Sequence, residues 1–266
     1  MNSDEWGSVI LAGGFGTRIK HLHPNVPKPM IETCGKPFME WVILYLAAQG
    51  IRDFSISTGY KAEIIEEYLA KRFDDGLFIT SVREDEPLGT AGGFLMAAKA
   101  LSSRKLLIAA NGDSLVLADL QPAIQLMEAG EADAVMIGCR VPDCSRYGSL
   151  KIGPDGFLSE FGEKRLGEGI INAGIYLLSS KTVLIFPGQR PLSFEYDVFP
   201  LILSRGLKVK VAVTDEPFID MGTPETVTMA DAFIRKHMDR FGDVKSFMKK
   251  RGANMKPQRA QRKYEI

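Results

Sequence analysis

The segment Ser8–Arg18, which reads SVILAGGFGTR, decides the fold. It begins with an apolar run that predicts a short buried strand, and three glycines follow at once. The next stretch, Pro37–Gln49, has the apolar spacing of a helix, so the segment opens a strand–loop–helix unit. Glycines after a strand let backbone N–H groups approach a phosphate without obstruction by Cβ. We therefore expect a phosphate-binding loop, called the glycine loop below, at Gly13, Gly14 and Gly16.

Outward from this segment, strand-like and helical stretches alternate along the chain. Strands are expected at 8–12, 54–58, 78–82, 106–110 and 134–140, and helices at 37–49, 63–72, 91–100 and 121–128. Such alternation predicts an α/β domain with a doubly wound, mostly parallel, Rossmann-like sheet. A Pro-Asp-Gly turn between 149–152 and 157–161 predicts a hairpin, and with it a small inserted antiparallel subregion.

The last third of the chain contains two more expected strands, at 170–178 and 208–213, and a final helix. Thr223-Pro224-Glu225 has the N-cap, first-turn proline and acidic residue of a helix start, and this helix is expected to end near Lys236. From Lys245 to Ile266 the chain is basic and has few large apolar residues. We therefore predict one domain over 1–238 and a basic, flexible C-terminal tail over 239–266.

Composition excludes several classes of protein. Thirty-three basic residues balance 33 acidic ones, so no overall field favours nucleic acid or a membrane as a partner. The longest apolar run, Trp41–Ala48, is too short to span a bilayer. Three cysteines, Cys34, Cys139 and Cys144, lack the number and spacing of a disulfide framework or a structural zinc site. We expect a cytoplasmic protein and leave the oligomeric state open, with a homo-oligomer among the alternatives.

Two cations accompany the glycine loop. Arg18 ends it, and Lys28 stands between Pro27 and Pro29, whose fixed φ angles hold an extended segment and aim the side chain. The loop is neither a P-loop nor a dinucleotide fingerprint, because no Gly-Lys-Ser/Thr follows and Ile19 occupies the third glycine slot. A tight turn without a ligand is the alternative. The two cations favour a triphosphate site.

Two carboxylates follow short apolar strands. Asp113 comes after 106–110 in Asn-Gly-Asp, and Asp220 ends the run Phe-Ile-Asp at 218–220. Ligands of open α/β sheets bind at the carboxyl ends of the strands. Magnesium uses one or two protein carboxylates and keeps several waters, so a sparse pair suits it. We predict a Mg²⁺ site at these two residues, with ordinary turn residues as the alternative.

A third group lies in the later strands. Glu163, Lys164 and Asn172 offer an acid, a cation and an amide that could bind a sugar phosphate, and a solvated edge strand is the alternative. The histidines do not form a triad or a metal cluster by their spacing, and we interpret all three as structural or surface residues: His21, His23 and His237.

Taken in order, these motifs resemble those of the sugar-phosphate nucleotidyltransferase family. The resemblance covers about residues 7–236 and rests on 11–18, 27–29, 86–92, 111–113, 163–164, 172–174 and Asp220, with further likeness at 146–148 and 193–195. It implies a fold of the nucleotide-diphospho-sugar transferase type. The chain departs from some members in lacking a repeat domain after Lys236, so regulation through such a domain is not expected.

The resemblance also implies roles for individual residues. Catalytic roles fall to Arg18, Lys28 and Asp113, and metal binding to Asp113 and Asp220. The nucleotide would be bound by Leu11, Ala12, Gly13, Gly14, Gly16, Thr17, Glu84, Pro87, Gly89 and Thr90. The sugar phosphate would be bound by Tyr147, Gly148, Glu163, Lys164 and Asn172.

The implied reaction joins GMP from GTP to D-glycero-α-D-manno-heptose 1-phosphate, giving GDP-heptose and pyrophosphate for cell-surface polysaccharide. Mannose 1-phosphate with GTP, or another sugar 1-phosphate with UTP or dTTP, are alternatives. A non-catalytic nucleotide-sugar sensor is a rival of another class, but it has no need of both metal carboxylates. A nicotinamide dehydrogenase is disfavoured by the failed dinucleotide fingerprint.

Overall fold

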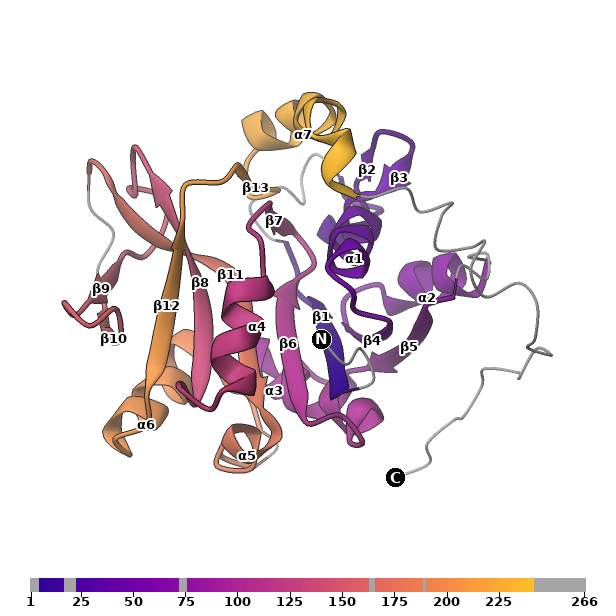
Figure 1. Cartoon of the computed structure of the whole chain (residues 1–266). Coiled ribbons are helices and arrows are strands. Elements are labelled where there is room, and N and C mark those ends of the chain that lie inside the picture. The colour runs from indigo at the N-terminus through magenta and orange to yellow at the C-terminus, as the bar shows by residue number, and fades with distance from the viewer. Residues whose placement is uncertain (1–4, 17–22, 72–75, 163–165, 189, 242–266) are drawn as a thin grey trace.

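The computed structural model describes residues 5–16, 23–71, 76–162, 166–188 and 190–241. A seven-stranded sheet runs through the molecule in the order β12-β8-β11-β6-β1-β4-β5 (Figure 1). Its strands are β1 (Trp6–Ala12), β4 (Asp53–Thr58), β5 (Phe78–Arg83), β6 (Leu106–Asn111), β8 (Ala134–Val141), β11 (Gly169–Ser179) and β12 (Val209–Thr214). They begin and end within a few residues of the predicted strands.

The sheet is mostly parallel, as predicted. β1 pairs in parallel with β4 and β6, β4 pairs in parallel with β5, and β12 pairs in parallel with β8. β11 is the exception, because it runs antiparallel to both β6 and β8. β6 therefore lies in the middle of the sheet, with parallel strands on one side and the antiparallel β11 on the other.

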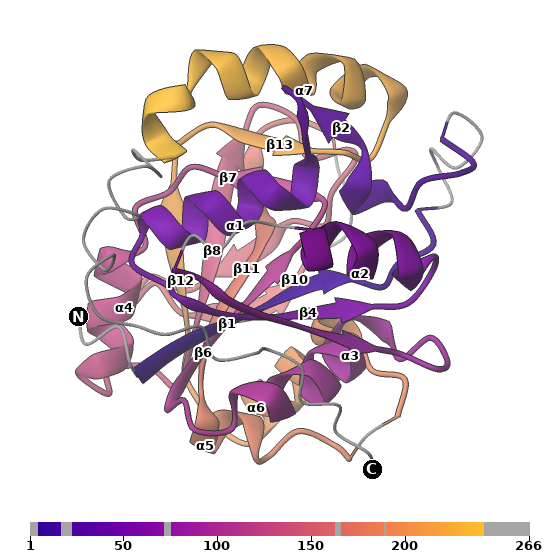
Figure 2. The same cartoon turned by 90° about the vertical axis from the view of Figure 1, so that its right-hand side faces the viewer.

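Helices cover both faces of the sheet, which confirms the doubly wound arrangement (Figure 2). One hydrophobic core joins the sheet to α1 (Phe38–Ala48), α2 (Ala62–Lys71), α4 (Gln121–Glu128) and α7 (Pro224–Lys236). The other joins its opposite face to α3 (Gly89–Ala98), η3 (Lys99–Leu101), the π-helical turn η4 (Phe194–Val198) and α6 (Phe199–Ser204), with α5 (Ser180–Val183) following β11. α1 is buried from Phe38 to Ala47, as expected of a helix that is apolar on all sides.

Three small antiparallel ribbons complete the fold. β9 (Leu150–Ile152) and β10 (Leu158–Phe161) form the predicted hairpin, and Gly156 in its turn has φ of 78°. β7 (Ser114–Val116) pairs with β13 (Phe218–Asp220), and β2 (Glu32–Thr33) pairs with β3 (Lys36–Pro37) after the short helix η2 (Lys28–Met30). The pairing of β7 with β13 links segments about 100 residues apart in the sequence, and no local pattern predicts it.

The C-terminal helix follows its predicted chemistry. The Thr223 hydroxyl accepts a hydrogen bond from the Thr226 N–H, and Pro224 opens α7. The fold then extends three residues into the segment for which we predicted a tail. Residues 238–241 form η5 (Met238–Phe241), in which the buried Phe241 ring packs on Trp41 with ring centroids 5.0 Å apart. Residues 242–266 lie outside the described part of the chain, so the tail stays a prediction there.

No helix within the described ranges is both long enough and apolar enough to cross a bilayer.

Candidate active site

The glycine loop leaves β1 at the carboxyl edge of the sheet and packs on its neighbours. The Gly13 carbonyl accepts a hydrogen bond of 3.2 Å from the Tyr60 N–H. A Cβ on Gly13 would lie 2.7 Å from a Glu84 carboxylate oxygen, and a Cβ on Gly59 would lie 2.8 Å from the Gly13 carbonyl oxygen. Gly14, in contrast, is exposed, and a Cβ there would meet nothing within 4 Å. The loop is therefore held on one side and open on the other, as a phosphate cradle requires.

Four predicted site residues lie outside the described part of the chain: Thr17, Arg18, Glu163 and Lys164. Leu11 and Ala12 form the end of β1, next to the loop, and the Leu11 carbonyl accepts a hydrogen bond of 2.9 Å from the Gly112 N–H. This bond joins the ends of β1 and β6 and brings the Asn-Gly-Asp turn beside the glycine loop.

Lys28 lies where its flanking prolines were expected to aim it. Pro27, with φ of −66° and ψ of 146°, precedes η2, and both Pro27 and Pro29 are buried. The Lys28 ammonium is 2.6 Å from Asp113 Oδ2, and the two side chains are 15% and 33% exposed. One predicted phosphate-binding cation and one predicted metal ligand therefore neutralise each other in this arrangement.

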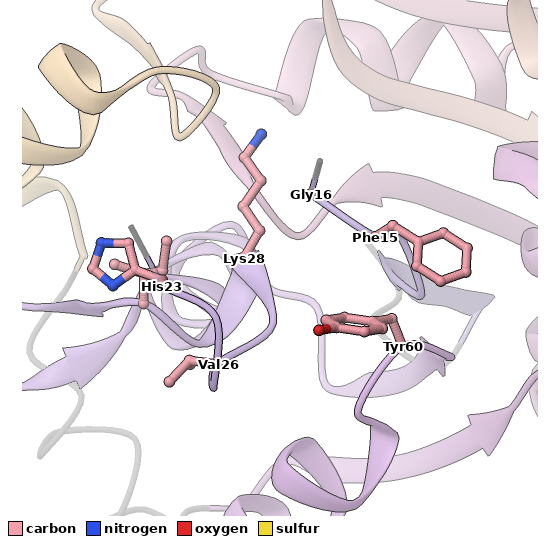
Figure 3. A pocket seen from close by; sticks show the side chains of 7 residues that line it. Phe15, Gly16, His23, Val26, Lys28 and Tyr60 are labelled. Carbon is pink, nitrogen blue, oxygen red and sulfur yellow. The ribbon is translucent and has the colours of Figure 1, made fainter. Parts of the chain in front are cut away.

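An aromatic pair forms one wall of the pocket around Lys28. Phe15, at the tip of the glycine loop, faces Tyr60 with ring centroids 5.5 Å apart, and Lys28 lies between this pair and His23 (Figure 3). Gly16, Val26 and Ile31 complete the lining. Phe15 is 48% exposed although it is large and apolar, so the pocket offers a flat surface to a ring system.

Asp113 and Asp220 come together through the backbone of the β7–β13 ribbon. The Met221 N–H donates a hydrogen bond of 2.8 Å to the Asp113 carbonyl, and Asp220 lies directly opposite Ser114 in the ribbon. Asp113 follows the central strand β6, as predicted. Two carboxylates about 100 residues apart in the sequence thus share one edge of the sheet.

The Asp220 carboxylate already has several donors. Arg146 Nη2 lies 3.0 Å from Oδ2 and 3.2 Å from Oδ1, and the Tyr147 hydroxyl donates to Oδ2. The Gly222 N–H donates to Oδ1. The carboxylate is only 12% exposed, so these bonds are protected from water and orient it firmly. Tyr147, predicted to bind the sugar phosphate, thus contacts a predicted metal ligand, and a Cβ on Gly148 would lie 3.6 Å from the Gly162 carbonyl oxygen.

A second hydrogen-bond network surrounds Asn172, at a bulge of β11. The register of β11 against β8 shifts between Asn172 and Tyr176, and Gly174 within the bulge has φ of 76°. The Asn172 amide donates to the Tyr176 hydroxyl at 2.7 Å and to Glu195 Oε1 at 2.9 Å, and its oxygen accepts from the Gly174 N–H at 3.0 Å. Burial, and then the charge of Glu195, raises the pKa of the Tyr176 phenol, which stays protonated. The bulge therefore presents an amide fixed on both sides.

The segment predicted to face the base has structural partners of its own. The two Glu84 oxygens accept hydrogen bonds from Ser57 Oγ at 2.7 Å and from the Leu88 N–H at 2.9 Å. A Cβ on Gly89 would lie 2.5 Å from the Leu192 carbonyl oxygen, so packing alone requires glycine there.

Two other residues of this segment, Thr90 and Pro87, differ in their contacts. Thr90 Oγ1 accepts from the Phe194 N–H at 3.1 Å, whereas Pro87 is exposed. The Thr90 contact ties the segment predicted to face the nucleotide to the turn that carries Glu195. Whether the residues of this segment touch a nucleotide stays a prediction.

The sequence reasoning gave no role to Arg146, Glu195 or Tyr176. Arg146 and Glu195 stood in segments that carried the family resemblance, but nothing in their spacing identified their partners Asp220 and Asn172. The available signal was the Asn-Ala-Gly interruption of the strand at 172–174, which is typical of a bulge. Bulges are frequent beside active sites.

The donor set fits a hard, sparsely ligated cation. Within the described ranges, histidine, cysteine, aspartate and glutamate form no group of three or more that could hold a metal ion. Asp113 and Asp220 remain as a pair of oxygen donors, which is enough for magnesium bound together with substrate phosphates but not for a structural zinc site.

Comparison with known proteins agrees with this geometry. The sequence profile of the nucleotidyl transferase family matches residues 7–237. The chain is 34% identical over 219 residues to the D-glycero-alpha-D-manno-heptose 1-phosphate guanylyltransferase of Campylobacter jejuni, covering 82% of this chain and 95% of that protein. It is 33% identical over 235 residues to the mannose-1-phosphate guanylyltransferase of Mycobacterium tuberculosis, covering 87% of this chain and 65% of that protein.

A solved structure supports the same conclusion. The crystal structure of HddC from Yersinia pseudotuberculosis complexed with GMP-PN superposes with a TM-score of 0.76 at 36% identity, and the match covers 86% of this chain and 99% of that one. The resemblance read from the sequence is thereby confirmed. The chain belongs to the nucleotidyl transferase family and is a nucleotidyltransferase.

Proposed function

We propose that this enzyme transfers GMP from GTP to D-glycero-α-D-manno-heptose 1-phosphate, releasing pyrophosphate and giving GDP-heptose. One observation carries the reaction class: Asp113 and Asp220 meet through the Met221–Asp113 backbone bond, beside a turn that bonds to the base of the glycine loop through Gly112 and packs on the Asn172 bulge through Asn111. A nucleotide site and a sugar site thus flank one pair of carboxylates. The names of both relatives support GTP as the nucleotide, and the name of the Campylobacter jejuni relative supports the heptose.

The covalent step is an in-line displacement at the α-phosphorus of GTP. A phosphate oxygen of the sugar 1-phosphate forms the new O–P bond while the bond to the bridging oxygen of pyrophosphate breaks, and pyrophosphate takes the electron pair. A phosphate monoester has a second pKa of about 6, so the nucleophile is mostly dianionic at neutral pH and needs no general base. Positioning and charge stabilisation supply the rate enhancement.

Residues of the chain divide this task. The backbone N–H groups of the glycine loop bind the triphosphate, and Lys28 and Arg18 stabilise the negative charge that develops on pyrophosphate. Asn172, oriented by Glu195, and Glu163 bind hydroxyls of the sugar, whereas Lys164 and the 147–148 segment bind its phosphate. Asp113 and Asp220 would hold magnesium, which would supply positive charge to the phosphates. Lys28 then exchanges Asp113 for a phosphate oxygen.

The choice of base rests on the family resemblance and on the surroundings of residues 84–90. Glu84 already accepts two hydrogen bonds, whereas Glu86 is exposed and its carboxylate can accept guanine N–H groups. A site that hydrogen-bonds the base discriminates strongly against analogues that leave polar groups unpaired. We expect ATP, UTP, CTP and dTTP to react much more slowly than GTP. Equal turnover with UTP or dTTP would contradict the guanylyl assignment.

Mannose 1-phosphate is the competing sugar. It shares the manno ring with the heptose and lacks one hydroxymethylene group beyond C6. If the protein hydrogen-bonds the extra hydroxyl, its absence costs about 1–3 kcal/mol, or roughly a five- to 150-fold preference for the heptose.

Pyrophosphate release, measured as kcat/KM with GTP and each sugar 1-phosphate, tests the whole assignment. A preference for mannose 1-phosphate would leave the reaction class intact and replace the sugar. A preference for glucose 1-phosphate would contradict the assignment of a manno-configured sugar as the substrate. Binding without pyrophosphate release would favour the non-catalytic sensor.

We propose a cytoplasmic role in nucleotide-sugar supply for cell-surface polysaccharide, carried out by a catalytic domain that extends through η5 to Phe241, with a basic tail after it. The substrates are then the nucleoside triphosphate and the sugar 1-phosphate, without nucleic acid or membrane. The oligomeric state stays open.

A further inference from the structure

The β7–β13 ribbon has two different faces. Directly opposite residues of an antiparallel pair place their side chains on the same face. Leu115 lies opposite Ile219, and both are buried in the hydrophobic core. Ser114 lies opposite Asp220, so this pair belongs to the other face. The hydroxyl of Ser114 therefore stands beside the carboxylate of a predicted metal ligand.

Contacts of the neighbouring loop identify the same face independently. Tyr147 packs edge-on against Phe218 with ring centroids 5.7 Å apart, and its hydroxyl donates to Asp220. Phe218 and Asp220 are two apart in β13 and thus share one face. Ser114 lies on this face, under the loop that carries Arg146.

The Ser114 hydroxyl is buried and has no hydrogen-bond partner. The residue is 8% exposed, and its Oγ is one of four such atoms within the described ranges, the others being in Ser8, Thr33 and Ser55. An unsatisfied buried hydroxyl costs free energy and calls for an explanation. Ser55 lies on β4 opposite Val9 and has no carboxylate beside it in the pairing. Only Ser114 combines the unpaired hydroxyl with a position opposite an active-site carboxylate.

We propose that Ser114 is a positioning residue for Asp220 in the metal-bound enzyme. In the present arrangement Arg146 occupies both oxygens of the carboxylate. A magnesium ion bound at Asp220 competes with Arg146 for those oxygens, and one hydrogen-bond position becomes open when Arg146 leaves. The Ser114 hydroxyl then donates to the carboxylate and fixes its orientation toward the ion. Partners of this kind typically raise metal affinity by about 10- to 100-fold. This inference rests on the metal role proposed for Asp220.

The test is a titration of the whole protein with MnCl₂, with free Mn²⁺ followed by electron paramagnetic resonance. Ser114→Ala should raise the Mn²⁺ dissociation constant by about 10- to 100-fold, and Ser114→Cys, which keeps the same branching with a larger atom that donates only weakly, should do the same. Ser55→Ala removes a hydroxyl that is equally buried and unpaired, so it is the matched control and should bind Mn²⁺ like the wild type.

Thermal unfolding in EDTA separates positioning from a structural role. Ser114→Ala removes an unpaired buried group, so it should melt at or above the wild-type temperature without metal. Wild-type Mn²⁺ affinity in both Ser114 variants, or a loss of affinity accompanied by a clear fall in the metal-free melting temperature, would overturn the proposal.

Asp220→Asn separates the proposed metal role of Asp220 from the proposed positioning role of Ser114. If this variant binds Mn²⁺ like the wild type, the metal role of Asp220 in the proposed function fails. If it loses Mn²⁺ while the Ser114 variants do not, only the role of Ser114 fails.

Discussion

The two sides of the proposed site, one for the nucleotide and one for the sugar, are built from different groups. In the described part of the chain, the proposed nucleotide side consists of the glycine loop, whose backbone lies open to solvent at Gly14, and the Lys28 cation. The sugar side consists of side chains bound to one another, with Asn172 fixed by Glu195 and by Gly174. Backbone groups bind any phosphate in the same way, whereas a fixed set of side chains fits one arrangement of hydroxyls. The difference suggests that triphosphate binding is general and sugar choice is specific.

The two carboxylates show the same contrast. The Asp113 side chain is 33% exposed and pairs with one cation, whereas the Asp220 side chain is 12% exposed and is bound by Arg146, Tyr147 and a backbone N–H. A partly exposed carboxylate with one ion-pair partner exchanges that partner easily, whereas removing the partners of a buried carboxylate with several hydrogen bonds costs more free energy. Asp113 is therefore the adaptable member of the pair and Asp220 the preorganised one.

The largest expected effect comes from neutralising either carboxylate. Asp113→Asn and Asp220→Asn should each reduce turnover by roughly 100-fold or more, since one preorganised charge partner is typically worth about 3 kcal/mol of transition-state stabilisation. Only Asp220→Asn should also lower the free energy of unfolding, by about 1–3 kcal/mol, because it weakens bonds to Arg146 and Tyr147.

Steady-state turnover with magnesium and urea denaturation followed by circular dichroism measure the two effects. Near-normal turnover in both variants would remove the proposed metal pair. Equal stability of the two variants would erase the contrast between an adaptable and a preorganised carboxylate.

The next effect is expected in the glycine loop, which packs on Gly59 on one side and is exposed at Gly14 on the other. Gly59→Ala places a Cβ against the Gly13 carbonyl, so it should lower the free energy of unfolding by about 1–3 kcal/mol and raise KM for GTP. Gly14→Ala meets no protein atom, so it should raise KM for GTP with stability within about 0.5 kcal/mol of the wild type. A Gly14→Ala variant with unchanged KM would show that the open side of the loop does not touch the nucleotide.

An effect of similar size but confined to one substrate is expected on the sugar side. Asn172→Ala removes the amide held by Glu195 and should raise KM for the sugar 1-phosphate by roughly five- to 150-fold, corresponding to about 1–3 kcal/mol, while KM for GTP stays unchanged. Gly14→Ala is the matched control, because it should raise KM for GTP and leave KM for the sugar 1-phosphate unchanged. Parallel rises of both constants in Asn172→Ala would break the division into two sides.

The smallest effect is expected from the C-terminus. Deleting Lys245–Ile266 should leave both KM values and turnover within about twofold, because this basic stretch has few large apolar residues to contribute to a core. The truncation leaves intact Phe241, which packs on Trp41. A large rise in KM for GTP after truncation would show that the tail contributes to nucleotide binding.

Much of the fold could be predicted from the sequence because its signals are local. Apolar runs and helical spacing located the strands of the main sheet and α1 to within a few residues, and Thr223-Pro224-Glu225 located the start of α7. The glycine loop and Asp113 were recognisable because each directly follows an apolar strand. Periodicity and turn chemistry act within a few residues of the chain, so one sequence window contains the information.

Tertiary structure alone decided the rest. The antiparallel insertion of β11, the pairing of β7 with β13 and the Arg146–Asp220 contact join residues far apart in sequence. A carboxylate at the end of a strand has the same local pattern whether it meets lysine, arginine or metal. The sequence by itself therefore determined which residues could do the chemistry, whereas packing of the sheet determined which of them meet. The physical reason is that residues far apart in sequence come into contact only when the chain between them closes into a loop, and no local pattern specifies that closure.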